Sequence, residues 1–164
     1  MKPLRILFSL AVFASTLAFA QSQASAADKL SDVLKESKMD GIVGDWVDPE
    51  TKEKKIMTRF AWKIKDRVLE VTTKNGEMVT TALMGVNGKT GEVFHMGADS
   101  DGTSSIGTWT VPAPGEAVLG IIYTTSAGQE GGLSIRHKLI AKDTLLVTIE
   151  LPQLITYKLV RVKK

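Results

Sequence analysis

The two histidines of this chain are the side chains best suited to acid–base or ligand chemistry near neutral pH. His137 alternates with Ile135 and Leu139, so an extended strand would place its imidazole on an apolar face. There it could ligate a haem iron or orient a polar ligand, although a hydrogen-bonded core histidine is the more common case. His95 stands between two apolar residues, so the sequence does not show whether its side chain lies on the inner or the outer face of the strand.

The types and spacing of the potentially reactive residues argue against a metal site and against catalysis. The chain has no cysteine, and neither histidine has a carboxylate at metal-ligand spacing. Asp99-x-Asp101-Gly102 begins like a calcium loop, but its glycine comes too early and no glutamate stands at the twelfth position, so we predict a turn. No Gly-x-Ser-x-Gly or His-Glu-x-x-His motif is present, and no nucleophile–base pair can be identified. We therefore expect no enzyme, no metal and no resident cofactor.

Aromatic side chains supply the other candidates. Trp46, Trp62 and Trp109 are suited to core packing, and Trp62 and Trp109 also to stacking on a ligand. The candidate ligand-binding residues are His137, Trp62, Trp109 and Tyr157.

The stretch 85–111 shows which elements must position these side chains. It reads as strand, turn, strand, turn, strand, with Asn87-Gly88 and Asp101-Gly102 as the residues that tolerate the positive φ of tight hairpins. In its last strand Ser105 and Trp109 share one face. Strands joined by such short reversals are antiparallel neighbours.

The same pattern repeats along the chain and predicts an all-β fold. About ten strands are separated by short turns. Residues 112–115 are predicted to form a loop, because two prolines cannot both lie in the hydrogen-bonded ladder of a central strand. An up-and-down antiparallel barrel of eight to ten strands would leave no exposed edge, and a two-sheet sandwich is the alternative. The predicted strands are 42–47, 56–64, 68–73, 78–86, 92–96, 105–111, 117–125, 133–140, 145–151 and 155–163.

One helix is predicted before the strands, within 27–41. Its apolar residues recur at helical spacing, and Asp28 or Ser31 could cap it. We expect it to plug or flank one end of the barrel, with a partner-binding amphipathic helix as the alternative.

The first 26 residues resemble a secretory signal peptide. Lys2 and Arg5 precede an uncharged apolar run at 6–19, and small residues allow cleavage after residue 20 or 26. The run is too short to span a membrane. Without cysteine the product would carry neither disulfides nor a lipid anchor. We expect a periplasmic or secreted bacterial monomer with 42–164 as its barrel domain.

The charge of the chain does not indicate nucleic acid. The formal charge is +3, and Lys2 and Arg5 of the leader contribute two of these positive charges. The chain has no basic patch interleaved with aromatic residues.

Gly44-Asp45-Trp46 resembles the Gly-x-Trp motif on the first strand of the lipocalin-like (calycin) barrels. The resemblance implies that Arg161, on the last strand, packs across Trp46. The sequence from Asp99 to Trp109 is also similar to exported bacterial lipocalin-like domains of unknown function, although no tryptophan follows Gly85 as in that group. In the related nitrobindin-type barrels a histidine binds haem, which is the alternative for His137.

We therefore expect a non-catalytic exported barrel that binds a small apolar or amphipathic ligand. Large side chains could instead fill the interior, which would make the protein a structural or interaction module. The haem-binding barrel is the second alternative, and we expect no haem. The side chains that could fill the interior are Met78, Met84, Leu133, Leu139, Leu145 and Tyr157.

Overall fold

The computed structural model describes residues 29–150 and 153–163, with only the backbone of 52–55. The predicted signal peptide 1–26 and the suggested helix cap Asp28 lie outside the described residues.

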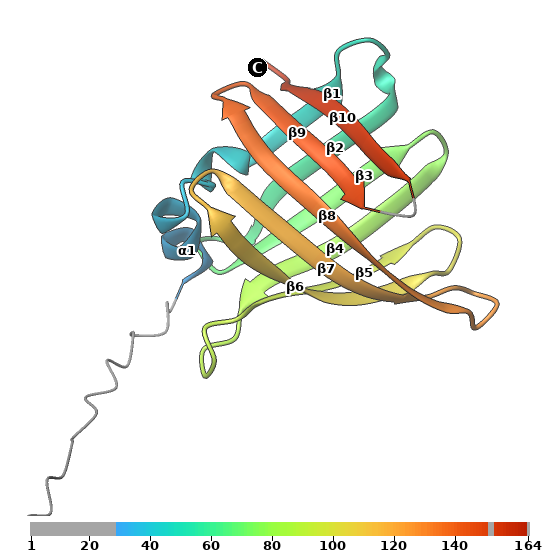
Figure 1. The fold of residues 1–164 in the computed structure, drawn as a ribbon, viewed down its shortest axis with the longest axis horizontal. Helices are drawn as coiled ribbons and strands as arrows, with labels where there is room; N and C mark the ends of the chain where they lie inside the picture. Colours follow the sequence, from blue (N-terminus) through green and yellow to red (C-terminus); the bar gives the residue numbers. More distant parts are fainter. Residues whose placement is uncertain (1–28, 151–152, 164) are drawn as a thin grey trace, which may run out of the picture.

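In the described residues, ten antiparallel strands close into one barrel (Figure 1). Each strand pairs with the next along the chain, and β1 pairs with β10 to complete the ring. The predicted all-β, up-and-down barrel is therefore confirmed. The strands are β1 (Gly44–Asp48), β2 (Lys52–Ile64), β3 (Val68–Asn75), β4 (Met78–Val86), β5 (Val93–Asp99), β6 (Ser104–Ala113), β7 (Glu116–Thr124), β8 (Glu130–Ala141), β9 (Thr144–Glu150) and β10 (Leu154–Arg161).

Alternation along each strand separates an apolar interior from the outer face. On β6, Ser105 and Trp109 share one face as predicted, and this face lines the barrel interior, while Ile106 between them is 60% exposed. The core is a continuous cluster that joins the helical segment to buried residues of nine strands. Its members include Leu34, Met39, Ile42, Trp46, Phe60, Leu69, Met84, Val93, Trp109, Leu119, Leu145, Val147 and Leu159.

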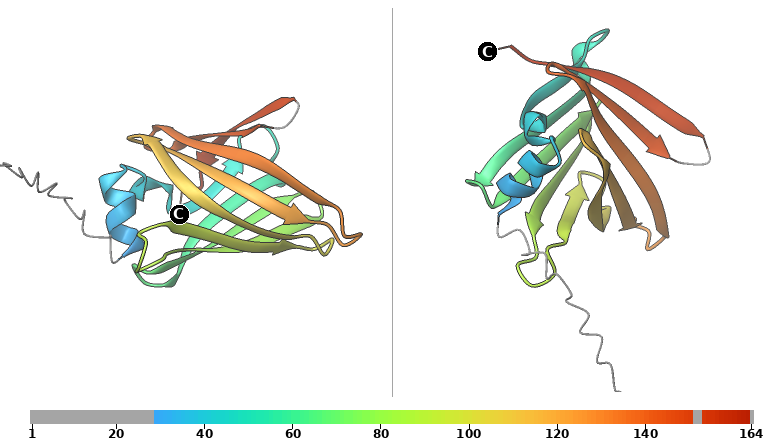
Figure 2. Two further views of the ribbon diagram at one scale, coloured as in Figure 1. Left: turned by 60° about the horizontal axis from the view of Figure 1, so that its bottom comes forward. Right: turned by 60° about the vertical axis from the view of Figure 1, so that its left-hand side comes forward.

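A short helical segment closes one end of the barrel (Figure 2). Helix α1 (Leu30–Glu36) is followed by a 3₁₀ turn, η1 (Asp40–Ile42), so the regular helix is shorter than the predicted 27–41. Leu30 and Leu34 are buried against the barrel. The suggestion of Ser31 as a cap is wrong, because the helix begins one residue earlier and Lys29 occupies the cap position.

Two hydrogen bonds hold this segment to the loops at that end. The N–H of Ser31 donates to the carbonyl oxygen of Asp66 at 3.2 Å, and the N–H of Gly115 donates to that of Ser37 at 2.7 Å. The predicted position of the helix at a barrel end is confirmed.

Two predicted connections differ in detail. Positive φ in the β4–β5 loop occurs at Gly91, at 73°, and not at Asn87-Gly88. The Asn87 side-chain oxygen accepts the N–H of Lys89 at 3.0 Å, and its carbonyl accepts the N–H of Gly91 at 2.7 Å, so the loop spans six residues between the strands. The predicted loop 112–115 is also too long, since β6 continues to Ala113.

The proline in β6 is tolerated because the pairing slips there. The register between β6 and β7 shifts between Thr110 and Ala113, so Pro112 lies within the irregularity and need not donate to the regular ladder.

The fold requires glycine at position 107 on β6, because there is no room for a side chain. A Cβ there would lie 2.1 Å from the carbonyl oxygen of Gly120 on β7, which is backbone and cannot rotate away. We expect Gly107→Ala to lower the free energy of unfolding by about 1–3 kcal/mol, the usual range for overpacking. Gly120→Ala is the matched control, since a Cβ there meets nothing within 4 Å. Urea denaturation of both variants checks this, and equal stability would contradict the close approach.

Among the described residues, no helix combines the length and apolar character needed to cross a membrane.

Candidate ligand-binding cavity

A cavity of about 310 Å³ lies inside the barrel. It reaches from a deep layer of rings to the β3–β4 and β5–β6 turns, at the end of the barrel opposite α1. Its volume is near the lower limit of about 300–1,000 Å³ for small-molecule sites. The residues of the deep part are Thr58, Val71, Ala82, His95, Trp109, Leu119, Ile135, His137, Val147 and Leu159, and the outer part adds Ile56, Thr73, Asn75, Met78, Thr80, Ala98, Asp99, Thr103, Ser105, Ile121, Tyr123, Leu133, Ile149 and Tyr157.

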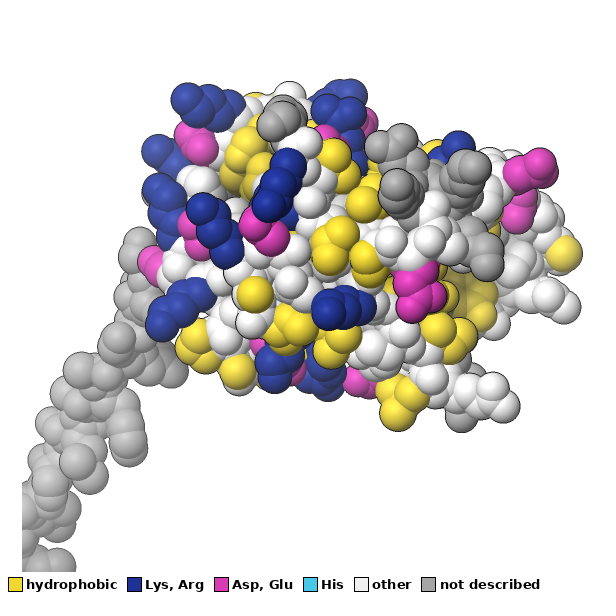
Figure 3. Space-filling model, turned by 90° about the horizontal axis from the view of Figure 1, so that it is seen from above, with side chains coloured by type: hydrophobic (Ala, Val, Ile, Leu, Met, Phe, Trp, Pro, Cys, Tyr) yellow, Lys and Arg dark blue, Asp and Glu magenta, His cyan; other side chains and the backbone are white. Residues whose placement is uncertain are grey.

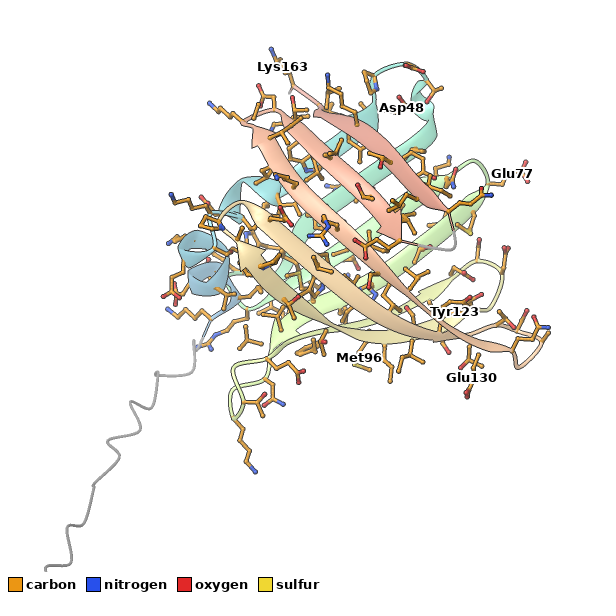
Figure 4. All side chains as sticks on the ribbon, in the orientation of Figure 1. Asp48, Glu77, Met96, Tyr123, Glu130 and Lys163 are labelled. Atoms are coloured by element: carbon orange, nitrogen blue, oxygen red, sulfur yellow. The ribbon has the colours of Figure 1, made fainter. Side chains whose placement is uncertain are left out.

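The two ends of the barrel differ in character. Figure 3 shows most Lys and Arg side chains toward the α1 end, while hydrophobic side chains are spread over the whole face. In Figure 4, Glu77 and Glu130 lie at that opposite end, beside the β3–β4 and β7–β8 turns.

Four rings form the closed end of the cavity, and we call Phe60, His95, Trp109 and His137 the ring layer. The ring centroids of Trp109 and His137 are 5.0 Å apart, and Phe60 meets His137 edge-on at 6.1 Å. His95 lies 6.5 Å from Trp109 on the other side. Below the layer, only a hollow of about 20 Å³ separates it from α1. The helical segment thus seals this end.

Strand pairing brings the ring layer together. His95 on β5 lies opposite Gly107 on β6, and Trp109 is the next inward residue of β6. His137 on β8 lies opposite Ala117 of β7, whose small side chain leaves room for the rings.

Three nitrogen atoms of this layer have no hydrogen-bond partner among the described residues. They are Nδ1 of His95, Nδ1 of His137 and Nε1 of Trp109. Each side chain is more than nine-tenths buried, with 6%, 6% and 7% of its residue surface exposed. Leaving a buried polar atom unpaired costs about 1–3 kcal/mol. Three in one layer are therefore a costly arrangement in an otherwise apolar core.

Both imidazoles are neutral at pH 7. Burial lowers the pKa of His137 to about 4, against a smaller, opposite effect of a hydrogen bond with the backbone of Ile135. Burial also lowers the pKa of His95. A neutral imidazole offers one N–H donor and one acceptor nitrogen.

The rest of the lining is apolar apart from hydroxyl groups, the side chain of Asn75 and a rim carboxylate. The hydroxyls of Thr58 and Thr73 hydrogen-bond each other at 3.3 Å. No Lys or Arg side chain is part of the described lining. The charged rim residue is Asp99, and its Oδ1 accepts the backbone N–H groups of Asp101 and Thr103, each at 2.9 Å.

This geometry confirms the predicted turn at Asp99. The backbone hydrogen bond from Thr103 is the main cause that lowers the pKa of Asp99. Gly102 provides the positive φ of the turn, at 86°.

The structure gathers three of the four predicted ligand-binding residues. His137, Trp109 and Tyr157 line the cavity. Trp62 does not, since it lies half-buried on β2 and packs against the edge of the core. His95, whose facing was left open, completes the ring layer.

The interior is not filled, although the sequence allowed it. Met84 and Leu145 are buried near the α1 end, and Leu139 packs against the core. Met78, Leu133 and Tyr157 line the cavity. These side chains therefore do not fill the interior completely, and a structural or interaction role of the barrel stays a prediction.

The Gly-x-Trp motif lies at the α1 end, away from the cavity. The Arg161 guanidinium carbon is 4.3 Å from the centroid of the Trp46 ring, as predicted. Its Nη1 donates to the carbonyl of Val43 at 2.9 Å, and its Nη2 donates to that of Gly41. Gly44 is required beside it, because a Cβ at Gly44 would lie 2.5 Å from Nη1 of Arg161.

Trp46 is completely buried beneath this cation, and its Nε1 donates to the carbonyl of Ile42 at 2.7 Å. The motif thus fastens η1, β1 and β10 together and serves the fold. It does not contribute to the cavity.

The residues of the cavity do not fit a haem. His137 is at the closed end, with Trp109 and Phe60 against its ring. The described lining offers no Lys or Arg to neutralise the propionates. In the described part of the chain, no group of three His, Cys, Asp or Glu residues is placed to hold a metal ion.

No family model matches this chain, and a search of the curated proteins finds no similar sequence.

Proposed function

We propose that this protein is an exported, non-catalytic lipocalin-like barrel that binds one small, mostly apolar molecule in its cavity. The observation that carries the proposal is the cavity itself, an apolar space of about 310 Å³ that reaches the mouth of the barrel. An engineered cavity of about 150 Å³ in another protein accommodates benzene. A ligand of roughly twice that size would suit the space.

Other observations support the remaining parts of the proposal. The contact between Arg161 and Trp46 agrees with the lipocalin-like resemblance. Lys2, Arg5 and the apolar run 6–19 support export to the periplasm or the medium. We propose no catalysis because Nδ1 of each histidine lacks a hydrogen-bond partner among the described residues. Neither imidazole is therefore oriented by a carboxylate or hydroxyl group in the way that would activate a nucleophile.

The test is binding of the fluorescent apolar probe N-phenyl-1-naphthylamine to the purified mature protein. We expect a saturable blue shift with one site per chain, because the probe leaves water for an apolar interior. Thr80→Phe should weaken binding about tenfold or more, since Thr80 lines the cavity. Thr81→Phe is the matched control, because the adjacent side chain is exposed on the outer face.

Equal probe binding by the two variants would place the site outside the cavity and contradict the proposal. Haemin serves as a second probe in the same titration. We expect no stoichiometric shift of its Soret band, and a shift that disappears in His137→Ala would establish the haem-binding alternative instead.

A further inference from the structure

A row of large apolar side chains forms a ridge on the outer face of the barrel. The register places them directly opposite one another on the consecutive strands β4, β5, β6 and β7, and we call Leu83, Met96, Ile106 and Ile122 the outer ridge. They are 40%, 59%, 60% and 63% exposed, in that order. Figure 4 shows Met96 on the outer side of the barrel. Single exposed apolar residues are normal, but a contiguous group of them often marks an interaction site.

The next outward row toward α1 lies lower than the ridge, and we call Gly85, Phe94, Thr108 and Gly120 the glycine row. A Cβ at Gly120 would meet nothing within 4 Å, so the space above this glycine is open. A Cβ at Gly85 would lie 2.6 Å from the ring of Phe94, so this ring covers the other glycine. The ridge therefore has a shallow hollow beside it.

The face that carries these two rows is uncharged. Neither row contains a charged residue, and the row on the mouth side, from Thr81 to Thr124, contains none either. On the flanking strand β3, Glu70 lies opposite Leu83, and its carboxylate is paired with Lys63 at 3.0 Å. A second copy of this face can therefore meet the first without bringing unpaired like charges together. A lipid surface fits less well, since segments that lie on membranes carry Lys or Arg beside their apolar residues.

The size of the face determines how strong such a contact can be. With strands about 4.8 Å apart and same-face residues about 6.7 Å apart along a strand, three rows on four strands cover roughly 400 Å². Two such faces bury roughly 800 Å² or somewhat more, which is below the 1,200 Å² or so at which stable complexes begin and is typical of weak, transient ones. The contact should therefore be reversible.

We propose that the outer faces of β4–β7 of two copies of this chain pack on each other as a weak, symmetric dimer. The two-fold axis runs across the strands, midway between the outer ridge and the glycine row, so the ridge of each copy lies on the glycine row of the other. Ile122 then enters the open space above the partner's Gly120, and Met96 contacts the ring of the partner's Phe94, a favourable sulfur–aromatic pair.

This arrangement has a consequence for the cavities. Rotation about an axis across the strands makes the strands of the two copies run in opposite directions, so the two mouths stay open at opposite ends of the dimer. The dimer replaces the monomer that the sequence led us to expect. It does not depend on the proposed ligand.

Sedimentation velocity of the mature protein over a wide concentration range tests the association. We expect the sedimentation coefficient to rise with concentration, with a dissociation constant of roughly 10–100 µM, as suits a small interface. Ile106→Asp should weaken the association about tenfold or more, because it buries a carboxylate of each copy in the apolar contact. Ile140→Asp is the matched control, since Ile140 is 51% exposed on β8, outside the face, and it should leave the association unchanged.

Cross-linking tests the symmetry and does not need a charged variant to fold. The chain has no cysteine, so a single introduced thiol reports one position. Ile122→Cys should be joined to its own copy by a bismaleimide with a spacer of about 11 Å, since face-to-face sheets lie about 10 Å apart. Ile140→Cys is the matched control and should stay uncross-linked.

A monomer at every concentration, or equal cross-linking of the two cysteine variants, would overturn the dimer. It would also be overturned if the protein stays monomeric and sediments with phosphatidylcholine vesicles in a way that Ile106→Asp abolishes, which would assign the face to a lipid surface. Binding of N-phenyl-1-naphthylamine should be the same in Ile106→Asp as in the unmodified protein, so failure of the dimer and failure of the proposed function can be told apart.

Discussion

Arg161→Ala is expected to lower the free energy of unfolding by about 2–3 kcal/mol. The guanidinium lies 4.3 Å from the Trp46 ring centroid, and a cation–π contact of this kind contributes about 0.5–2 kcal/mol. The same group donates to the carbonyl of Val43 at 2.9 Å, and hydrogen bonds from charged donors add about 1.5–3 kcal/mol when well shielded. The side chain is 23% exposed, so we take the lower part of the summed range. Urea denaturation at pH 7.5 measures the effect.

Two control variants separate this contact from a general loss of positive charge. Arg161→Lys keeps the charge but lacks the planar, forked guanidinium that stacks on a ring while it donates, so it should recover less than half of the lost stability. Arg59→Ala removes an exposed ion pair to Asp45, in which the arginine is 58% exposed, and should cost below about 1 kcal/mol. If Arg161→Ala is no more destabilising than Arg59→Ala, the ring contact does not fasten β1 to β10.

Most strands could be predicted because the alternation of apolar and polar residues and the positions of turn residues indicate the same strand boundaries. β4 occupies residues 78–86 in both prediction and structure, and Ser105 and Trp109 share one face of β6 as their spacing predicts. Both signals are local, so they can be read without knowing which strands pair. The contact between Trp46 and Arg161 joins residues far apart in the sequence, and it could be predicted only from the resemblance of Gly44-x-Trp46 to the lipocalin-like motif.

The errors at Asn87 and Pro112 have one physical origin. Turn residues show where a chain can reverse, but side-chain hydrogen bonds and bulges decide how many residues it uses. The Asn87 side chain accepts the N–H of Lys89 and widens its loop. A register shift before Ala113 lets a proline remain within β6.

The ring layer could not be predicted because it depends on strand register. If Asp101-Gly102 formed a two-residue hairpin, His95 would lie opposite an outward residue of β6. The four residues 100–103 in fact separate β5 from β6, which pairs His95 with Gly107 on the inward face. A slip of one residue reverses the facing of a whole strand. The open cavity is likewise a product of packing across strands far apart in sequence.

The stability of the protein is expected to fall by about 3 kcal/mol as the pH drops from 6.5 to about 4, through His137. Its pKa in the folded protein is lowered to about 4 by burial, against 6.5 when unfolded. Between these two values the unfolded chain binds the proton more readily, so each step toward acid favours unfolding. Each pH unit between the two pKa values changes the free energy of unfolding by about 1.4 kcal/mol, and the whole interval gives the expected loss of about 3 kcal/mol. His95, whose pKa burial also lowers, acts in the same direction.

The measurement is the free energy of unfolding by urea at pH 7.5, 6.5, 5.5 and 4.5. His137→Gln, which stays uncharged throughout, should remove most of the slope between pH 6.5 and 4.5, and His95→Gln a smaller part. Asp99 and Glu116 do not interfere, because their pKa values are lowered from 3.8 and 4.5 and they lose their contribution below this window. A slope that persists unchanged in both variants would mean that neither imidazole is held neutral in the ring layer.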